Sequence, residues 1–314
     1  MGVPSRFGQI QADAFLGSAH DNSPFGKIWY VDVTNGSDGN SGEAPDEAYA
    51  SIGAAISAAV ATRGDSVVIA PGTYTITSAL APKAFMTFRA AVINPQAPSV
   101  SIRGNIANLM TVDVNGARFV GVEFRATGST AKDLIALAAT TAITGGVTFE
   151  DCVFNGNDQT AATPNGVAAI QLTNGSNATT GLVVRRCLFR DLGKTCVDVG
   201  VLGMPYAKIE DNVFAIDTAA GIGIALADTA AYATGKGYTI RNNEFIGPSA
   251  TTSTTVGIVI AGTVRTTGQG IIRNNFFASC ADAAVTVDKI PDGVINNYYG
   301  NNAGGVLIDS SAGA

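Results

Sequence analysis

Few residues of this chain have the types and the spacing that catalysis requires. The single histidine, His20, lies close to the N-terminus, so histidine-based triads and most zinc sites are not expected. Four cysteines in 314 residues are too few for a disulfide scaffold, and their spacing fits no CxxC metal pattern. The chemistry that remains to be tested is that of carboxylates, alone or beside an arginine, as in the cleavage of polysaccharides.

Three aspartates lie in or at the end of segments rich in Val, Ile and Leu, but they do not suggest a catalytic group. Asp113 and Asp198 lie in separate segments and Asp228 lies at the end of a third, with no arginine beside any of them. If the chain were an enzyme, Asp198 with Lys194 and Asp211 would be the first residues to test. We therefore predict no catalytic residue, no cofactor-binding residue and no cofactor.

Oxygen-bearing side chains near the N-terminus raise the alternative of a calcium site. Asp32, Asp38, Asn40 and Glu43 lie in or beside a Gly- and Ser-rich segment, and calcium prefers clustered oxygen ligands. The complete calcium-loop pattern is absent, and the same residues are typical of turns in which an Asp or Asn side chain binds the following backbone. We predict such a turn, and no metal ligand.

A short motif recurs through most of the chain. Residues 241–245, Arg-Asn-Asn-Glu-Phe, return almost unchanged at 273–277 as Arg-Asn-Asn-Phe-Phe, and looser copies precede and follow them. A recurring unit of this length indicates a repeat architecture. The aromatics of successive copies are 30, 35, 25, 31, 32 and 22 residues apart, at Phe124, Phe154, Phe189, Phe214, Phe245, Phe277 and Tyr299.

The composition fits short strands joined by tight turns. Charged residues make up 14% of the chain, and 37 residues are glycine. The net charge of -6 disfavours nucleic acid as the main partner. The apolar runs are too short to span a bilayer, and the first residues lack a signal-peptide pattern. We expect no nucleic-acid partner, no membrane insertion and no export by a signal peptide.

Residues 28–33 and 66–70 read as strands, and residues 51–60 have the apolar spacing of one amphipathic helix. With the turn at 35–42 and the sequence Val-Ile-Ala-Pro-Gly-Thr-Tyr at 68–74, this region resembles the first coil of right-handed parallel β-helix proteins of the pectate-lyase-like superfamily. The resemblance implies an all-β, right-handed parallel β-helix (solenoid) whose short N-terminal helix covers the open end. It implies little about activity, because this fold carries enzymes, adhesins and virion proteins.

Two segments follow from this organisation. Residues 1–27 lack the strand pattern but carry Phe7, Phe15 and Phe25, which favours an attachment arm; a disordered terminus is the alternative. Residues 28–314 are predicted to form one β-helix domain.

In a β-helix, equivalent residues of successive coils stack about 4.8 Å apart. The residue two places before each aromatic is predicted to point inward with it and to form a ladder that satisfies buried polar groups. Cys152 and Cys187 are predicted to be buried thiols, with a disulfide as the alternative. The predicted ladder contains Cys152, Cys187, Asn212, Asn243, Asn275 and Asn297, and the predicted aromatic column contains Phe154, Phe189, Phe214, Phe245, Phe277 and Tyr299.

Charged residues recur three and four places before the aromatics. We interpret them as cross-strand pairs that fix register; glycan contact or catalysis is the alternative. The two columns are Glu150, Arg185, Glu210, Arg241 and Arg273, and Asp151, Arg186, Asp211, Asn242 and Asn274.

The chain most resembles β-helix proteins of bacteriophage particles: spikes, head fibres and decoration proteins. The resemblance implies a non-enzymatic structural protein located in the virion. Expected partners are further copies of the chain, as a homotrimer, and a capsid or tail protein bound by the arm. A host glycan is a further candidate, with Tyr206, Tyr232 and Tyr238 as loop aromatics that could contact it. The alternative function is a polysaccharide lyase or glycoside hydrolase on the same fold.

Overall fold

The structure of the chain is a computed structural model. It describes residues 26–94, 96–127, 133–138, 140, 143, 145–156, 168–173, 180–192, 195–199, 206–216, 221–227, 237–247, 256–261, 270–280, 285–287, 293–295 and 298–300. The three phenylalanines of the predicted arm, Phe7, Phe15 and Phe25, lie outside these residues, as does Asn297 of the predicted ladder. The backbone N–H of Lys27, the last residue of the predicted arm, donates to Asp65 Oδ1 at 2.9 Å.

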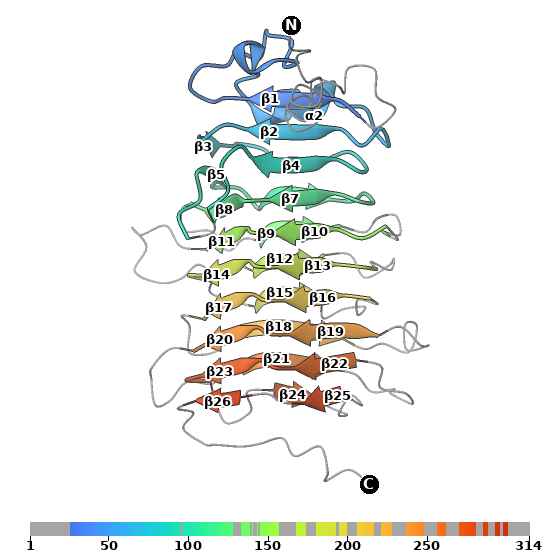
Figure 1. Ribbon diagram of the computed structural model, residues 1–314, viewed down its shortest axis with the longest axis vertical. Coiled ribbons are helices and arrows are strands. Elements are labelled where there is room, and N and C mark those ends of the chain that lie inside the picture. The colour runs from blue at the N-terminus through green and yellow to red at the C-terminus, as the bar shows by residue number, and fades with distance from the viewer. Residues whose placement is uncertain are drawn as a thin grey trace, which may run out of the picture.

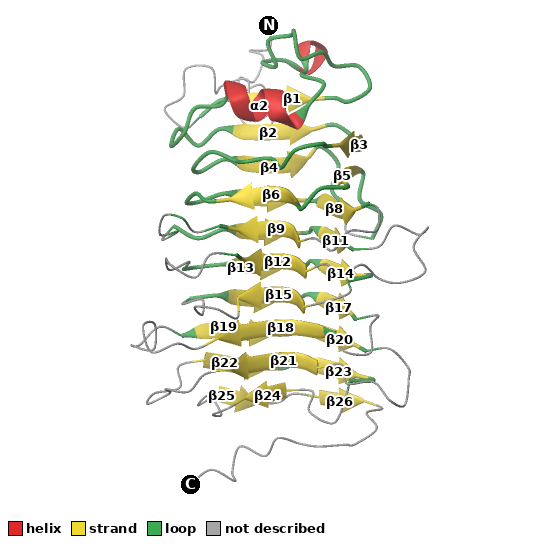
Figure 2. Cartoon of the chain, turned by 180° about the vertical axis from the view of Figure 1, so that it is seen from behind, coloured by secondary structure: helices red, strands yellow, loops and turns green. Residues whose placement is uncertain are grey.

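Three parallel sheets run along the molecule, and successive coils stack between its two ends (Figures 1 and 2). Sheet A contains, in stacking order, β1 (Ile28–Val31), β2 (Ser66–Ile69), β4 (Thr87–Ala90), β7 (Arg118–Val120), β10 (Thr148–Glu150), β13 (Val183–Arg185), β16 (Lys208–Glu210), β19 (Tyr238–Arg241), β22 (Gly270–Arg273) and β25 (Gly293–Ile295).

Sheet B contains β3 (Gly72–Thr75), β5 (Val100–Gly104), β8 (Val122–Ala126), β11 (Val153–Asn155), β14 (Leu188–Arg190), β17 (Val213–Ala215), β20 (Glu244–Ile246), β23 (Phe276–Ala278) and β26 (Tyr298–Gly300). Sheet C contains β6 (Asn108–Val112), β9 (Asp133–Leu137), β12 (Ala168–Leu172), β15 (Thr195–Val199), β18 (Ile222–Ala227), β21 (Val256–Ala261) and β24 (Val285–Val287). From β6 onward the chain passes through sheets C, A and B in turn, and each such passage is one coil.

The N-terminal end of the coil stack is covered by the helix that the apolar spacing predicts. Helix α2 (Ile52–Ala58) begins after Ser51, whose Oγ accepts a hydrogen bond from the Ala54 N–H at 3.2 Å. The helix buries Ile52, Ala55 and Ile56 and packs against β1 and β2 (Figure 2). A 3-10 turn, η2 (Pro45–Glu47), precedes it. Among the described residues, no helix has the length and apolarity that crossing a membrane requires.

The core is built around two stacks of phenylalanine rings. From Phe124 to Phe277 the rings stack coil on coil with centroids 4.5 to 5.6 Å apart, and each aromatic is the register partner of the next. A second stack, Phe88, Phe119 and Phe149, meets the first edge-on. All of these rings are fully buried, so each coil contributes a large apolar side chain to one continuous core. Tyr299 is the backbone register partner of Phe277.

The repeated motif forms two short strands in different sheets rather than one bent strand. Its first half belongs to sheet A and its second half to sheet B, and the first residue after the sheet A strand has left-handed backbone geometry. Asp and Asn tolerate this conformation better than most residues, and glycine tolerates it best. The weakest copy of the motif carries Gly121 there, with φ 71°. The other residues are Asp151, Arg186, Asp211, Asn242 and Asn274, with φ between 53° and 58°.

Candidate functional site on the charged face of sheet A

The first charged column lies on the outer face of sheet A. Glu150, Arg185, Glu210, Arg241 and Arg273 occupy equivalent places on β10, β13, β16, β19 and β22. The residue before each of them, from Phe149 to Ile272, is buried in the core. The alternation of a strand therefore holds these charged side chains on the outside.

Glu150 is the centre of this face. Its Oε2 accepts a hydrogen bond from Arg118 Nε at 2.8 Å, and its Oε1 accepts from Arg185 and, at 3.3 Å, from Arg186 Nη2. The Glu150 side chain is 2% exposed, whereas that of Arg118 is 48% exposed. Burial opposes ionisation of Glu150, but the guanidinium groups of Arg118 and Arg185 outweigh it and lower the pKa of the carboxyl. A general acid in glycoside cleavage needs a raised pKa, so Glu150 is poorly suited to that role.

Further pairs extend along the same side. Arg241 Nε lies 3.0 Å from Glu210 Oε1, and Arg186 Nε donates to Asp151 Oδ1 at 2.8 Å. Asn242 Nδ2 donates to Asp211 Oδ1 at 3.0 Å. Each of these contacts joins neighbouring coils, as the interpretation as cross-strand register pairs expects.

A shallow groove of about 450 Å³ follows this face. Two of its cations, Arg118 and Lys208, were not singled out in the sequence. Both lie six residues before a core phenylalanine, so the aromatic alignment contained the signal that would have found them. The groove is lined by Arg118, Thr148, Glu150, Val183, Arg185, Lys208, Glu210 and Arg241.

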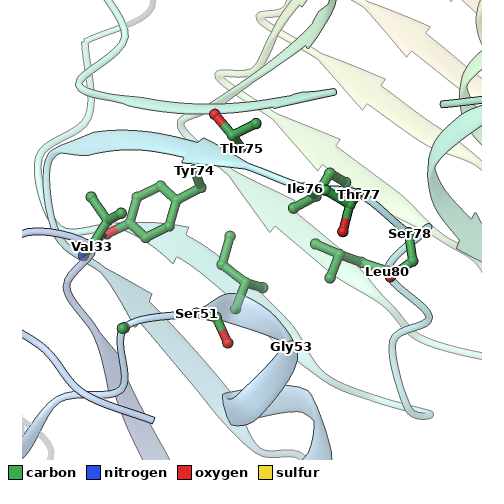
Figure 3. Close-up of a pocket in the computed structure, with 11 residues that line it drawn as sticks. Val33, Ser51, Gly53, Tyr74, Thr75, Ile76, Thr77, Ser78 and Leu80 are labelled. Atoms are coloured by element: carbon green, nitrogen blue, oxygen red, sulfur yellow. Dashed lines mark hydrogen bonds between the residues drawn. The ribbon is translucent and has the colours of Figure 1, made fainter. Parts of the chain in front are cut away.

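A second cavity, of about 280 Å³, lies beside the start of α2 (Figure 3). Val33, Ser51, Gly53, Tyr74 and Leu80 contribute to its wall. The Tyr74 hydroxyl donates to the Ala70 carbonyl at 2.9 Å, and burial raises the pKa of this phenol to about 12. Tyr74 therefore does not act as a base near neutral pH, and the cavity wall is poor in other titratable groups.

The residues of the calcium alternative do not converge. Asp32 accepts hydrogen bonds from the Thr34 and Asn35 backbone and from the Asn35 side chain. These bonds lower the pKa of Asp32, and the bond from the Asn35 side chain contributes most to that shift. Asp38 binds Ser51, at 2.8 Å to both its N–H and its hydroxyl. The described part of the chain contains no group of three or more acidic, Cys or His side chains that could hold a metal ion.

Asparagine amides form a buried ladder at the bend between sheets A and B. Asn212 Nδ2 donates to Asn243 Oδ1 at 2.9 Å, and Asn243 Nδ2 donates to Asn275 Oδ1 at 3.0 Å. The amides also donate to the Val184, Ile209 and Ile240 carbonyls of preceding coils. The ladder thus satisfies polar groups inside the core.

Towards the N-terminus, two cysteines continue the ladder in place of asparagine. The Cys187 N–H donates to Asn212 Oδ1 at 2.9 Å, and Cys152 Sγ lies 3.5 Å from the Phe119 carbonyl oxygen. Cys152 and Cys187 are free thiols and are not joined by a disulfide. Burial, together with neighbouring Cys152, raises the pKa of the Cys187 thiol, which makes it unreactive.

The structure does not bring Asp198 and Asp211, the two described residues of the candidate catalytic set, together. Asp198 lies on β15 in sheet C, whereas Asp211 lies at the bend between sheets A and B. Lys194 and Asp228 lie outside the described residues, as does Tyr232 of the possible glycan contacts. Tyr206 is 54% exposed, and Tyr238 is partly buried against the core.

Comparisons with known proteins identify the fold. No protein-family model and no curated protein matches the sequence. A pectin methylesterase from Aspergillus niger is similar in structure, with a TM-score of 0.54 and 15% identity over 92% of this chain and 89% of that one. The PL6 family alginate lyase AlyGC has a TM-score of 0.52 and 16% identity over 79% of this chain and 37% of that one. The chain is a right-handed parallel β-helix.

The predicted fold class is therefore confirmed, and the structural neighbours are pectate-lyase-like β-helix proteins, as the first coil suggests. At this low sequence identity, the structural similarity shows the fold alone and says nothing about the activity of this chain.

Proposed function

We propose that this β-helix is a non-enzymatic structural subunit of a bacteriophage particle: a capsid decoration protein, a head fibre, or a tail spike or fibre. Residues 1–27 attach it to a capsid or tail protein, and the subunit associates as a homotrimer. The observation that supports a structural role best is the use of the repeated charges. Glu150, Glu210 and Asp151 are bound by arginines of neighbouring coils, so these carboxylates hold the fold together.

Cleavage of a polysaccharide would require a different arrangement. Hydrolases use two carboxylates that flank one bond, and one of them must be protonated near neutral pH. Glu150 has a lowered pKa, and Asp198 and Asp211 lie on different sides of the molecule. The aromatic residues of the predicted arm and the low share of charged residues, 14%, favour attachment to a particle instead.

Mass spectrometry of purified particles of the phage that carries this gene tests the proposal. We expect the protein at a fixed copy number per particle. A chain that lacks residues 1–25 should keep its circular dichroism spectrum and its unfolding temperature but fail to join the particle. Absence of the full chain from virions, or normal incorporation of the shortened one, would contradict the proposal.

An activity screen addresses the enzymatic alternative. The purified chain is incubated with bacterial capsular and lipopolysaccharide glycans, and reducing ends and unsaturated products are measured. We expect no turnover. Turnover that survives Asp198→Ala and Asp211→Ala would show an enzyme whose site lies elsewhere, and would replace the structural role.

A further inference from the structure

The outer face of sheet B is charged in the N-terminal coils and mostly apolar in the C-terminal coils. Near the N-terminus its outward side chains include Arg103, Glu123 and Arg125. A parallel sheet with two apolar faces is normally covered on both. The C-terminal part of this face therefore has the character of a contact surface. The outward residues of β14, β17, β20 and β23 are Leu188, Arg190, Val213, Ala215, Glu244, Ile246, Phe276 and Ala278.

Three exposed apolar side chains lie near the bend between sheets A and B. Ile271 on β22 and Phe276 on β23 belong to the same coil, and each is 40% exposed (Figure 1). Ile246 on β20, one coil earlier, is 38% exposed. Large apolar side chains that gather on one side of a protein mark a surface that contacts another molecule. Because Ile271 faces outward from sheet A and the other two from sheet B, both sheets contribute to this surface.

The same two faces carry complementary charges. Lys208 on β16 of sheet A and Glu244 on β20 of sheet B are both exposed, and neither has an ion-pair partner among the described residues. Arg190, in contrast, is bound to Glu123 at 3.2 Å. Lys208 and Glu244 lie in neighbouring coils. Each face therefore offers one apolar group and one charge that the other face can match.

We propose that sheet A of one copy of this chain packs on sheet B of the next copy, around a threefold axis parallel to the coil stack. This inference rests on the homotrimer of the proposed function and names its interface. All copies in such a ring are parallel, so each coil lies beside the same coil of its neighbour. Ile271 then meets the next copy's Phe276 at the same height. Lys208 and the next copy's Glu244 differ in height by one strand spacing, about 4.8 Å, which a lysine side chain can span.

A second copy satisfies both faces with a single kind of contact. An interface between two different faces leaves one of each free on every subunit, and a closed ring pairs them all. The outward side chains recur at every coil, and a parallel neighbour presents the same period. Packing of sheet B on sheet B would instead bring Glu244 carboxylates together and leave Ile271 in water. The exposed residues therefore favour contact between the two different faces.

Analytical ultracentrifugation over a range of protein concentrations tests the interface. Phe276→Glu and Ile271→Glu should each raise the concentration of half-dissociation about tenfold or more, as expected for apolar residues central to an interface. Lys208→Glu should raise it about two- to fivefold, and adding Glu244→Lys to the same chain should restore association. Val60→Glu is the matched control, because Val60 is 49% exposed beside the capping helix, and it should leave association unchanged. Circular dichroism spectra like that of the original chain would show that the variants are folded.

Cross-linking identifies the two faces. The four natural cysteines are buried free thiols, so a short bis-maleimide reacts with introduced cysteines only. Chains with Ile271→Cys co-expressed with chains that carry Phe276→Cys should give cross-linked pairs, and either variant alone should give far fewer. Trimers that persist in both glutamate variants, without mixed cross-links, would overturn this interface and leave the homotrimer intact. An original chain that is monomeric at every concentration would overturn both, whereas the virion test above decides the particle role separately.

Discussion

The asparagine ladder allows a prediction of how strongly one side chain couples three coils. Asn243 is buried, and its side chain takes part in four hydrogen bonds. It donates to the Ile209 carbonyl at 2.9 Å and to Asn275 Oδ1 at 3.0 Å, and it accepts from the N–H and the side-chain amide of Asn212 at 3.1 and 2.9 Å. Replacement by alanine leaves the Ile209 carbonyl and the Asn212 N–H without these partners inside the core.

A buried polar group without a partner costs about 1–3 kcal/mol, so Asn243→Ala should destabilise the surrounding coils by about 3–5 kcal/mol. Asn243→Cys should cost less, because a thiol can approach the preceding carbonyl as Cys152 approaches that of Phe119, at 3.5 Å. The neighbouring Asn242→Gly is the control. Asn242 is exposed and has φ 55°, a conformation that glycine adopts readily, so its loss should change stability by less than about 1 kcal/mol.

Native-state hydrogen exchange is the appropriate measurement, because repeat proteins can open coil by coil. The Asn212 N–H should exchange much faster in Asn243→Ala than in the original chain, and amides of β2 should be unaffected. Urea unfolding followed by circular dichroism gives the global effect. A loss below about 1 kcal/mol in Asn243→Ala, or an equal loss in Asn242→Gly, would refute a stabilising role for the ladder.

Three further predictions concern buried groups. Asp65 accepts hydrogen bonds from Arg63, Lys27, Trp29 and Val60; these outweigh its burial and lower its pKa to about 2. Because this folded-state pKa lies below the ordinary value of 3.8, the stabilisation is complete above about pH 4 and is lost as pH falls towards 2. It amounts to about 2 kcal/mol, and Asp65→Asn should remove this pH dependence of urea unfolding. Glu150→Ala leaves three arginines beside one another and should lower the free energy of unfolding by about 2 kcal/mol. Glu150→Gln should lower it less. Thermal unfolding should show that the difference between the two variants shrinks in high salt. Burial raises the pKa of the Cys187 and Cys280 thiols, that of Cys280 to about 11. Iodoacetamide at pH 8 should therefore label these thiols only in the unfolded chain. Rapid labelling of the native protein, detected by mass spectrometry, would show that they are accessible.

The sequence was sufficient to predict the fold, because the residues that repeat are the residues that the core requires. Aligning the chain on Phe154, Phe189 and Phe214 gives the register of sheet B, and the apolar spacing near Ser51 gives the capping helix. The left-handed residue at the bend between sheets A and B was harder to predict, because Arg186 at that position is not a residue type that favours this backbone conformation. The residue types that indicate it are glycine in the weakest copy, Gly121, and Asp or Asn in four of the other copies.

The groove was harder to predict, because the amino-acid sequence alone does not say which arginines bind the same carboxylate. Arg118 and Arg185 both bind Glu150: Arg185 is its direct register partner, whereas Arg118 reaches it diagonally from the strand on the other side. That the positive charge of Lys208 has no ion-pair partner among the described residues becomes visible only when those pairs have been assigned. The role of Asp65 was hidden for a similar reason, since its partners Lys27 and Trp29 lie far from it in the sequence.

The continuous stack of rings and amides has a consequence for the length of the molecule. Phe214, Phe245 and Phe277 occupy equivalent places on successive coils, as do Asn212, Asn243 and Asn275. Removing the 32 residues 245–276 would join Phe277 to Glu244, so that Phe277 stacks on Phe214 while Asn243 stays bonded to Asn212, and both stacks would stay unbroken. We expect the shortened chain to fold, and a deletion of 16 residues at the same place to fail, as circular dichroism and hydrogen exchange would show. Such a molecule can gain or lose length only in whole coils, which makes the coil its unit of evolutionary change.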